Sequence, residues 1–586
     1  MSGTKIETFD FEIISIMSNA WYARQDIILV RCSGLNLEHS GIIAGMSGSP
    51  CYITDETGRE RMIGAVAFGW STNKDPICGL QPITQMLEIP EYYTTKDKSP
   101  VTAAKDSTES NLSAGIPVGR IVADLSSTPI PQASRFSILN DSNDTGRPLI
   151  PPASAAPAGL WPLKLPVAIS TLSEPAMSFL QPHFDRLGFT PVTGGGAGPS
   201  VRARAEDVQL EPGSVFCIPF MSGDLEMAGL GTCTEVIGER VLAFGHAAMG
   251  DGEVELPIAT GAVHTIIPSI VRSVKIGAAL RNVGTLRRDE NAGVFGVQGP
   301  APAMIPMEIS LRDVRGERVY RYEIVQERFL TAVLAGMGLL ESIYAHHSPP
   351  EEHNIRYAIE AEFEQYGVFR TSNMTSQDGG MGAQMDLYLP IQAMMNAPFG
   401  KARLKRCRVV LTIEKGALQA TIDDAQLRKT TYKPGETVTV RVRFRHYRRD
   451  PQLTWADFSL DLPDNVPDGR YELMVTSVNG HLQALTEEKP HLFLARSPDQ
   501  LLAALNMVAG YPANRLYLRL RLPEGGLAID KIEMPAPPTF WKRILTESRN
   551  RDVRSYAESS LAQYETDFSV DGNQTLTIIV DRRADQ

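Results

Sequence analysis

Short apolar runs and strictly alternating stretches dominate the pattern of hydrophobic and polar positions along this chain. The runs 27–30 and 63–68 are apolar throughout, which is typical of buried strands. Residues 438–445 alternate between apolar side chains and Thr or Arg, and residues 515–522 alternate in a similar way. Such alternation predicts sandwich strands with one solvated face. The pattern as a whole predicts a mainly β protein.

Changes in composition along the 586 residues predict several domains, because a single hydrophobic core does not grow to this length. In chain order we expect a strand-rich block at 1–95, an extended linker rich in Ser, Pro and Ala at 96–163, a small βαβ-like insert at 164–204, a second strand-rich block at 205–311, a mixed α+β region at 312–415, an Ig-like β-sandwich at 416–495, and a β-rich region with a helix at 496–586.

Helices with defined bounds are expected in two of these regions. The insert has the pattern of two strands, at 165–169 and 189–192, around a helix at 174–187. The mixed region has a helical pattern at 330–344 and an amphipathic stretch at 386–395. These elements give the β protein an α/β insert and an α+β region.

Charge and composition exclude several functions. The net charge of −11 leaves no overall basic footprint for a nucleic acid. Glycines interrupt the longest apolar stretch, at 330–340, and it is shorter than the ~18 residues of a membrane span. The six cysteines show no metal-ligand spacing, and the Gly-rich run 194–199 lacks the Lys-Ser/Thr of a phosphate loop. We therefore expect no nucleic-acid partner, no integral membrane segment, no metal and no cofactor.

The segment Gly45-Met46-Ser47-Gly48-Ser49-Pro50 lies between the two buried strands and suits a nucleophilic serine. Small neighbours let a substrate backbone approach the Ser47 hydroxyl. Glycines also allow the backbone conformations that point consecutive N–H groups at one place, where an oxyanion would form. The alternative is an ordinary Gly/Ser/Pro turn. The turn makes Ser47 the candidate nucleophile.

A serine nucleophile needs a base, which is most often a histidine. Of the ten histidines, His246 follows the apolar strand 241–244 and stands beside Gly245, where it could project into a cleft. The alternative is a histidine whose ring is satisfied by a backbone group. His264 is the second choice, and its apolar surroundings predict a buried histidine.

Two sets of segments resemble the SpoIVB-type sporulation serine peptidases. The segments "IETFDFEIIS", "GIIAGMSGSPCYI" and "MIGAVAF" are similar to the nucleophile half of that family. The segments "GDLEMAGLGTCTEVIGERVLAFGHAAMGDGEVELPI" and "VGTLRRDENAGVFG" are similar to its histidine half. The resemblance implies an exported bacterial peptidase with a chymotrypsin-like double β-barrel. It also implies Ser47 as nucleophile, His246 as general base, and the N–H groups of Gly45 and Ser47 as the oxyanion hole.

The chain departs from that family in two ways. The serine half precedes the histidine half, the reverse of the family order, so the peptidase domain would be circularly permuted. The family position for the acid of the triad holds Cys32. Asp26 and Asp251 are alternative third members, and a Ser-His dyad supported by a backbone carbonyl is equally compatible with the sequence.

We therefore expect a serine endopeptidase that acts on a protein or peptide substrate. The missing acid supports the alternative of an inactive peptidase-like scaffold that binds a protein partner through its C-terminal β-sandwich. If Met1 of the printed chain is internal to a longer natural chain, the resemblance implies a periplasmic or extracellular protein. Otherwise the absence of a signal peptide predicts a cytoplasmic one.

Overall fold

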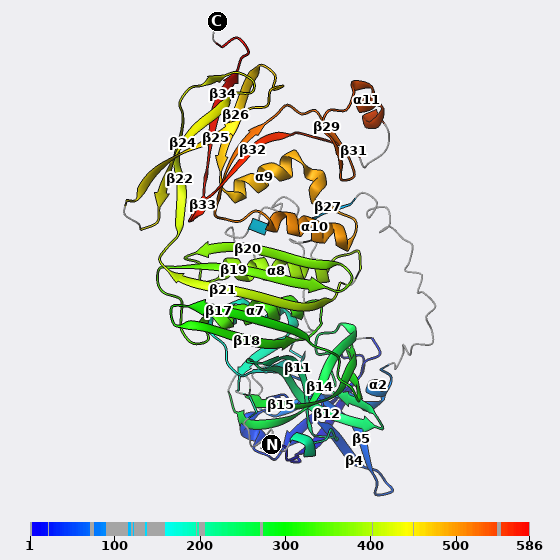
Figure 1. Cartoon of the computed structure of the whole chain (residues 1–586). Coiled ribbons are helices and arrows are strands. Elements are labelled where there is room, and N and C mark those ends of the chain that lie inside the picture. The colour runs from blue at the N-terminus through cyan, green and yellow to red at the C-terminus, as the bar shows by residue number, and fades with distance from the viewer. Residues whose placement is uncertain are drawn as a thin grey trace. The chain divides into compact units, whose positions relative to one another are not determined.

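The computed structural model describes residues 3–21, 23–70, 75–89, 115–118, 121, 135–136, 159–194, 196–197, 205–269, 273–400, 402–448, 451–547 and 553–584. The protein is mainly β, as the alternation predicts (Figure 1). It forms two compact units. Unit 1 contains Met1–Val101, Ile150–Met307 and Arg321–Glu341, and unit 2 contains Thr102–Leu149, Glu308–Tyr320 and Ser342–Gln586.

The N-terminal part of unit 1 is an antiparallel sheet. Its strands, in spatial order, are β1 (Asp10–Met17), β2 (Ile27–Ser33), β6 (Ile77–Pro82), β5 (Glu60–Gly69) and β4 (Pro50–Thr54), with β8 (Trp161–Pro162) paired to β5. The expected apolar strands at 27–30 and 63–68 are thus confirmed. Val30, Val66 and Leu80 are fully buried and pack into one core beneath the short helix α1 (Leu37–Ser40). The helix α2 (Ile83–Leu87) follows β6.

The histidine block of unit 1 closes into a ring of antiparallel strands. Each strand pairs with the next, and the last pairs with the first, so the described strands leave no free edge within the ring. The ring consists of β11 (Val215–Gly223), β12 (Met227–Ile237), β13 (Arg240–Ala243), β16 (Gly293–Gln298), β15 (Ser273–Glu290) and β14 (Gly252–Ile267).

The predicted βαβ-like insert has its elements where the sequence places them. The strands β9 (Leu165–Ile169) and β10 (Phe189–Thr193) are parallel, and α5 (Glu174–Leu187) connects them. The helix buries Leu180 and Phe184 and ends at Gly188, whose φ of 74° suits glycine. β9 also pairs with β12, so the insert extends the ring's sheet.

A short parallel pairing joins the two blocks of unit 1. The strand β3 (Ile43–Ala44) pairs with the start of β15, with Ile43 opposite Ser273 and Ala44 opposite Val274. A strand that leads directly to the Ser47 turn therefore belongs to the sheet of the histidine block.

Unit 2 contains an antiparallel three-stranded arrangement of β20 (Gly367–Ser376), β19 (His353–Phe363) and β21 (Leu404–Lys415). The helix α8 (Met381–Met395) packs on β19 and β20 and also against α10 (Pro498–Ala509). The expectation of an amphipathic helix at 386–395 is wrong. Because α8 is covered by these three neighbours, all its residues from 382 to 395 are buried.

The C-terminal part of unit 2 is a β-sandwich. One sheet is β25 (Leu453–Asp461), β24 (Thr437–His446), β22 (Gln419–Leu427) and β33 (Ser569–Asp571). The other is β23 (Thr431–Tyr432), β34 (Asn573–Val580), β26 (Gly469–Thr476), β28 (Arg515–Arg521) and β32 (Ser559–Glu565). The two sheets share one apolar core. The expected boundary at 495/496 falls inside this sandwich, because β28 pairs with β26.

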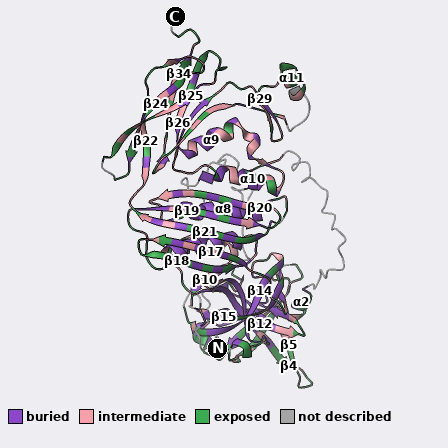
Figure 2. Cartoon of the chain, viewed as in Figure 1, coloured by how far each residue is buried: buried purple, intermediate pink, exposed green. Residues whose placement is uncertain are grey.

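The prediction of one solvated face holds for β24 but not for β28. On β24 the buried valines alternate with exposed or half-buried residues, a pattern visible in Figure 2. On β28 both Tyr517 and Arg519 are buried. The helix α9 (Val478–Glu488) covers this second face, and Arg519 pairs there with Glu488.

The remaining described elements connect these sheets or extend them. They are β7 (Ile116–Pro117), η2 (Ala205–Asp207), β17 (Ile305–Asp313), β18 (Gly316–Ile324), α7 (Leu330–Tyr344), η3 (Pro490–Phe493), β27 (Leu494–Ala495), β29 (Gly526–Ile529), β30 (Ile532–Met534), α11 (Thr539–Glu547) and β31 (Val553–Tyr556).

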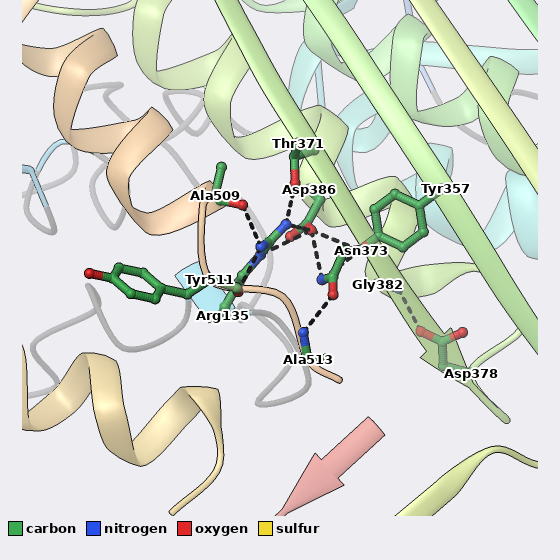
Figure 3. Close-up of polar contacts among 10 residues, drawn as sticks. All are labelled: Arg135, Tyr357, Thr371, Asn373, Asp378, Gly382, Asp386, Ala509, Tyr511 and Ala513. Carbon is green, nitrogen blue, oxygen red and sulfur yellow. Dashed lines mark hydrogen bonds and ion pairs between the residues drawn. The ribbon is translucent and has the colours of Figure 1, made fainter. Parts of the chain in front are cut away.

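The expected linker at 96–163 lies mostly outside the described residues, but its described part includes buried anchors. β7 pairs with β27, and the Arg135 guanidinium lies in the core of unit 2 (Figure 3). This guanidinium pairs with Asp386 at 2.6 Å and donates to the carbonyls of Ala509 and Tyr511 at 2.8 and 2.9 Å. The Tyr357 hydroxyl donates to the same Asp386 oxygen at 2.7 Å. Linker composition therefore does not predict these anchors, because each depends on partners far along the chain.

Candidate active site

Two glycines shape the turn that carries Ser47. Gly45 and Gly48 have φ of +97° and +92°, values that disfavour any other residue. A Cβ atom on Gly48 would lie 2.0 Å from the Thr232 oxygen and 2.6 Å from the Phe244 nitrogen. Gly48, the residue after Ser47, therefore contacts the backbone of Phe244, which lies two residues before His246. The sequence blocks that carry the two candidate residues meet at this point.

Strand β12 of the histidine block holds the carbonyl groups of the serine turn. The Thr232 N–H donates to the Ser47 carbonyl at 2.9 Å, and the Thr232 hydroxyl donates to the Gly45 carbonyl at 3.0 Å. The Thr234 hydroxyl donates to the Gly48 carbonyl at 2.9 Å. With these carbonyl groups tied to β12, the turn has a defined backbone conformation. The side chain of Met46, which lies between these two glycines in the chain, packs into the core of the N-terminal sheet.

A strained turn delivers His246 from the end of β13. Phe244 has a φ of +70°, and the Gly245 N–H donates to the Ala243 carbonyl at 2.9 Å. This is a γ-turn of the rare positive-φ type. The Phe244 ring lies over Gly231, where a Cβ atom would be 2.1 Å from it. Backbone strain of this kind needs support from the surrounding packing and is concentrated at functional sites.

The ring of His246 is neutral and has one free nitrogen. Its Nδ1 lies 2.7 Å from the Ala247 carbonyl, which can only accept, so Nδ1 carries the proton and Nε2 does not. Burial lowers the pKa of His246 to about 4. Both His246 Nε2 and Ser47 Oγ are buried without a hydrogen-bond partner in the described part of the chain. They do not hydrogen-bond to each other.

Asp289, which no pattern in the sequence singles out, positions the loop that follows His246. The Asp289 carboxylate is buried on β15 and accepts the N–H groups of Ala248, Met249 and Gly250 at 2.7, 2.6 and 2.8 Å. Burial raises the pKa of Asp289 to about 6 and outweighs these three hydrogen bonds, which lower it. The residue lies in the segment "VGTLRRDENAGVFG", but only the fold shows that it faces the loop.

The two alternative third members lie elsewhere. Asp26 accepts the N–H of Asn19 at 2.9 Å in an exposed turn, and Asp251 pairs with Arg328 at 3.3 Å. Neither carboxylate has a recorded contact with His246 among the described residues. The Cys32 thiol is buried, with its Sγ 3.6 Å from that of Cys78.

The prediction that His264 is buried is wrong. The residue lies on β14, where the strand runs out of the ring and its last residues become exposed. Of the two candidate histidines, only His246 is close in the chain to Phe244, whose backbone the serine turn contacts.

Comparison with protein-family models, with curated proteins and with solved structures finds no match to this chain. Within the described residues, no group of three or more His, Cys, Asp or Glu side chains could hold a metal ion. None of the described helices has the length and apolar character needed to cross a membrane.

Proposed function

We propose that this protein is a serine endopeptidase in which Ser47 is the nucleophile and His246 is the general base. The observation that carries the proposal is the occurrence of two reactive groups, both buried and without a hydrogen-bond partner, on neighbouring loops. His246 presents an unprotonated Nε2, and Ser47 presents a hydroxyl without a partner, on loops whose backbones touch. Buried polar atoms without partners are costly, so their presence at one place indicates a functional site.

The reaction would follow the usual course of acyl transfer. His246 Nε2 takes the proton from Ser47 as the hydroxyl oxygen attacks the scissile carbonyl, and it then gives that proton to the leaving amine. A water molecule, activated by the same nitrogen, attacks the acyl-enzyme and releases the second product. The Ala247 carbonyl keeps the proton on Nδ1, a task that a carboxylate performs in a triad. This makes the site a Ser-His dyad supported by a backbone carbonyl.

The oxyanion would be held by the N–H groups of Gly45 and Ser47. Preorganised N–H donors in a buried site stabilise developing negative charge strongly, because they need no reorganisation during the reaction. The hydrogen bonds from Thr232 to the Gly45 and Ser47 carbonyls support such preorganisation. In the structure the Ser47 carbonyl accepts from Thr232, and the Ser47 N–H has no recorded acceptor among the described residues.

A permuted, chymotrypsin-like arrangement fits this chemistry. The closed ring of the histidine block has the form of one half-barrel, and the N-terminal sheet would be the counterpart that supplies the nucleophile. Because such a cleft needs only the juxtaposition of its halves, their order along the chain can be exchanged. The pairing of β3 with β15 supports this juxtaposition.

The proposal requires a change before catalysis. Ser47 is fully buried and His246 is 2% exposed, so substrate must displace whatever covers them. Catalytic hydrogen bonds are often long in resting enzymes and shorten in the complex with substrate. We interpret the structure as a closed, resting form.

A peptide library of mixed sequence tests the activity while the substrate is still unidentified, with cleavage products detected by mass spectrometry. Ser47→Ala and His246→Ala should each lower kcat by about 10⁴–10⁶-fold, and the double variant should lose little more, because residues that act as a unit are not additive. Ser49→Ala is the matched control and should retain activity. Cleavage by Ser47→Ala at the wild-type rate would reject the proposal.

The second candidate is an inactive scaffold that binds a protein partner through its C-terminal β-sandwich. The observation in its favour is that Ser47 and His246 are buried and make no hydrogen bond with each other. A wild-type protein that cleaves no library peptide and does not react with a fluorophosphonate would favour this candidate.

A further inference from the structure

A buried lysine contacts the serine turn. Lys275 follows the two residues of β15 that pair with β3, so the parallel register brings it level with Gly45. The residue is 3% exposed, and its Nζ donates to the Gly45 carbonyl at 2.6 Å and to the Thr232 hydroxyl at 3.3 Å. The approach is close, since a Cβ atom on Gly45 would lie 3.0 Å from that of Lys275.

Lys275 has no carboxylate partner among the described residues. Its two acceptors are neutral oxygens, and the titratable group that faces it is the Cys217 thiol of β11. Burial raises the pKa of that thiol to about 12, so Cys217 supplies no negative charge at neutral pH. Burying an ammonium group without a counter-charge is costly, and structural reasons alone seldom retain such a group. Burial also lowers the pKa of Lys275 to about 8.

The contact acts on the peptide at the centre of the proposed oxyanion hole. The Gly45 carbonyl belongs to the peptide that joins Gly45 to Met46. The peptides on either side of it carry the N–H groups of Gly45 and Ser47. A peptide group is planar, so holding this carbonyl fixes the orientation of the Gly45–Met46 peptide, the unit to which both N–H-bearing peptides are attached.

We propose that Lys275 is a positioning residue of the peptidase site, which holds the Gly45 carbonyl and thereby keeps the oxyanion-binding N–H groups aligned. The proposal rests on the proposed function and extends it to a residue of β15, 230 positions from the turn that it holds. Lys275 acts through the backbone of the turn and does not itself take part in bond making. The Thr232 hydroxyl, which contacts both groups, shares the task.

The test is the rate at which a fluorophosphonate probe inactivates the purified full chain. Lys275→Met removes the charged donor and keeps an unbranched side chain. It should lower the maximal inactivation rate by about 10²–10³-fold, the loss that follows removal of one oxyanion-hole donor, with little change in the concentration of half-saturation. Thr260→Val is the matched control, since Thr260 is also buried in the ring and its hydroxyl has no recorded partner.

The pH profile separates a positioning role from a general loss of packing. In the wild type the inactivation rate should fall as pH rises through about 8, where Lys275 loses its charge, and Lys275→Met should lack this step. Thr232→Val removes the hydroxyl that also donates to the Gly45 carbonyl and should give a smaller loss of rate. It is the variant to measure if Lys275→Met does not fold.

The outcomes are distinct. If the wild type does not react at all, the proposed function fails. If the wild type reacts and both Lys275→Met and Thr232→Val react at its rate, the proposed function stands and the role of Lys275 is overturned. A wild-type profile without a step near pH 8 would equally contradict a role for the lysine charge.

Discussion

Burial determines the protonation state of His246. An imidazole in water is half-protonated near pH 6.5, whereas burial lowers the pKa of His246 to about 4. A general base must be unprotonated to accept the serine proton. Burial would therefore keep the proposed base in its reactive form well into the acid range.

The first prediction concerns the acid limb of the reaction. The rate of fluorophosphonate labelling should not be lost as pH falls through 6.5. Protonation of Asp289 near pH 6 should lower it only in part, and the full loss should come near pH 4, where His246 becomes protonated. The measurement is the inactivation rate between pH 3.5 and 7.5, with the far-ultraviolet circular dichroism spectrum recorded at each pH to check folding. A midpoint at or above 6.5 would show that the base is a solvent-exposed group.

The second prediction concerns stability. Between the unfolded pKa near 6.5 and the folded pKa near 4, the unfolded chain binds a proton at His246 that the folded chain does not. Stability should therefore be lost as pH falls through this window. In His246→Gln, the urea midpoint of unit 1 should fall less steeply from pH 7 to pH 4.5 than in the wild type. Equal slopes would show that His246 is not buried in its neutral form.

The third prediction separates the carboxylates. Asp26→Asn and Asp251→Asn should leave labelling within a few-fold of the wild type, far from the ~10⁴-fold loss seen when a triad acid is replaced. Asp289→Asn should cost about 10–100-fold, because an amide replaces the carboxylate that accepts three N–H groups of the loop beside His246. A 10⁴-fold loss at Asp26 or Asp251, with folding intact, would contradict the dyad.

Local sequence identifies some of these residues and not others. The glycines and the strand exit around Ser47 and His246 are local features, so both side chains could be singled out from the sequence. Asp289 and Lys275 depend on pairing between distant strands, and a charged residue inside a strand carries no sign of its partner. The burial of His264 was predicted wrongly because an apolar strand can run beyond the edge of its core.

At the scale of elements, the serine turn and β12 depend on each other. Gly48 packs against the Thr232 carbonyl and the Phe244 N–H, and the turn's carbonyls accept hydrogen bonds from β12. The γ-turn at Phe244 takes part in the same contact, because Gly48 packs against the Phe244 N–H. Close packing of the serine turn thus supports the backbone strain at Phe244.

The fourth prediction tests this contact. Gly48→Ala should destabilise unit 1 by about 3 kcal/mol or more, because it adds steric overlap with backbone atoms to the cost of a positive φ. Gly58→Ala is the matched control: Gly58 also has a positive φ, of +79°, but an added Cβ would meet nothing within 4 Å. Its cost should be only about 1 kcal/mol. Urea unfolding followed at unit 1 provides the comparison, and equal losses would contradict the packing argument.

Element types were predicted better than their surroundings. Alternation and capping residues are local, so β24 and α5 appear where the pattern places them. The surfaces of α8 and β28 were predicted wrongly, because a second layer covers the face that would otherwise be solvated. A sequence pattern records how polar a face is, whereas coverage depends on which distant element packs there.

At the scale of the whole molecule, one described residue of the expected linker, Arg135, is buried in unit 2. All its recorded hydrogen bonds are made inside that unit (Figure 3). Both members of the ion pair with Asp386 are 2% exposed. Breaking a buried pair of this kind leaves a charge without compensation.

The fifth prediction is that Arg135→Met destabilises unit 2 by about 3–5 kcal/mol, whereas replacing both residues, as in Arg135→Met with Asp386→Leu, recovers much of the loss. Hydrogen exchange of α8, measured by mass spectrometry, reports this unit without assuming that the chain unfolds in one step. Arg428→Ala, which breaks an exposed pair with Asp457, is the control and should change exchange little. Equal exchange in Arg135→Met and the control would contradict the anchor.

The architecture at this scale could be predicted only in part. The mainly β class follows from composition and periodicity. The closure of the ring, the pairing of β3 with β15 and the continuity of the sandwich across residue 495 are long-range pairings. No local pattern encodes them, because any two strands of suitable length satisfy the same alternation.

The central claim is that Ser47 is an activated nucleophile. The most direct measurement is to treat the full chain with a fluorophosphonate and to locate the adduct by tandem mass spectrometry of its peptides. The account predicts one adduct, on Ser47, that is lost in Ser47→Ala, strongly reduced in His246→Ala and retained in Ser49→Ala. An unmodified wild-type chain, or an adduct on Ser49 that survives in Ser47→Ala, would contradict it.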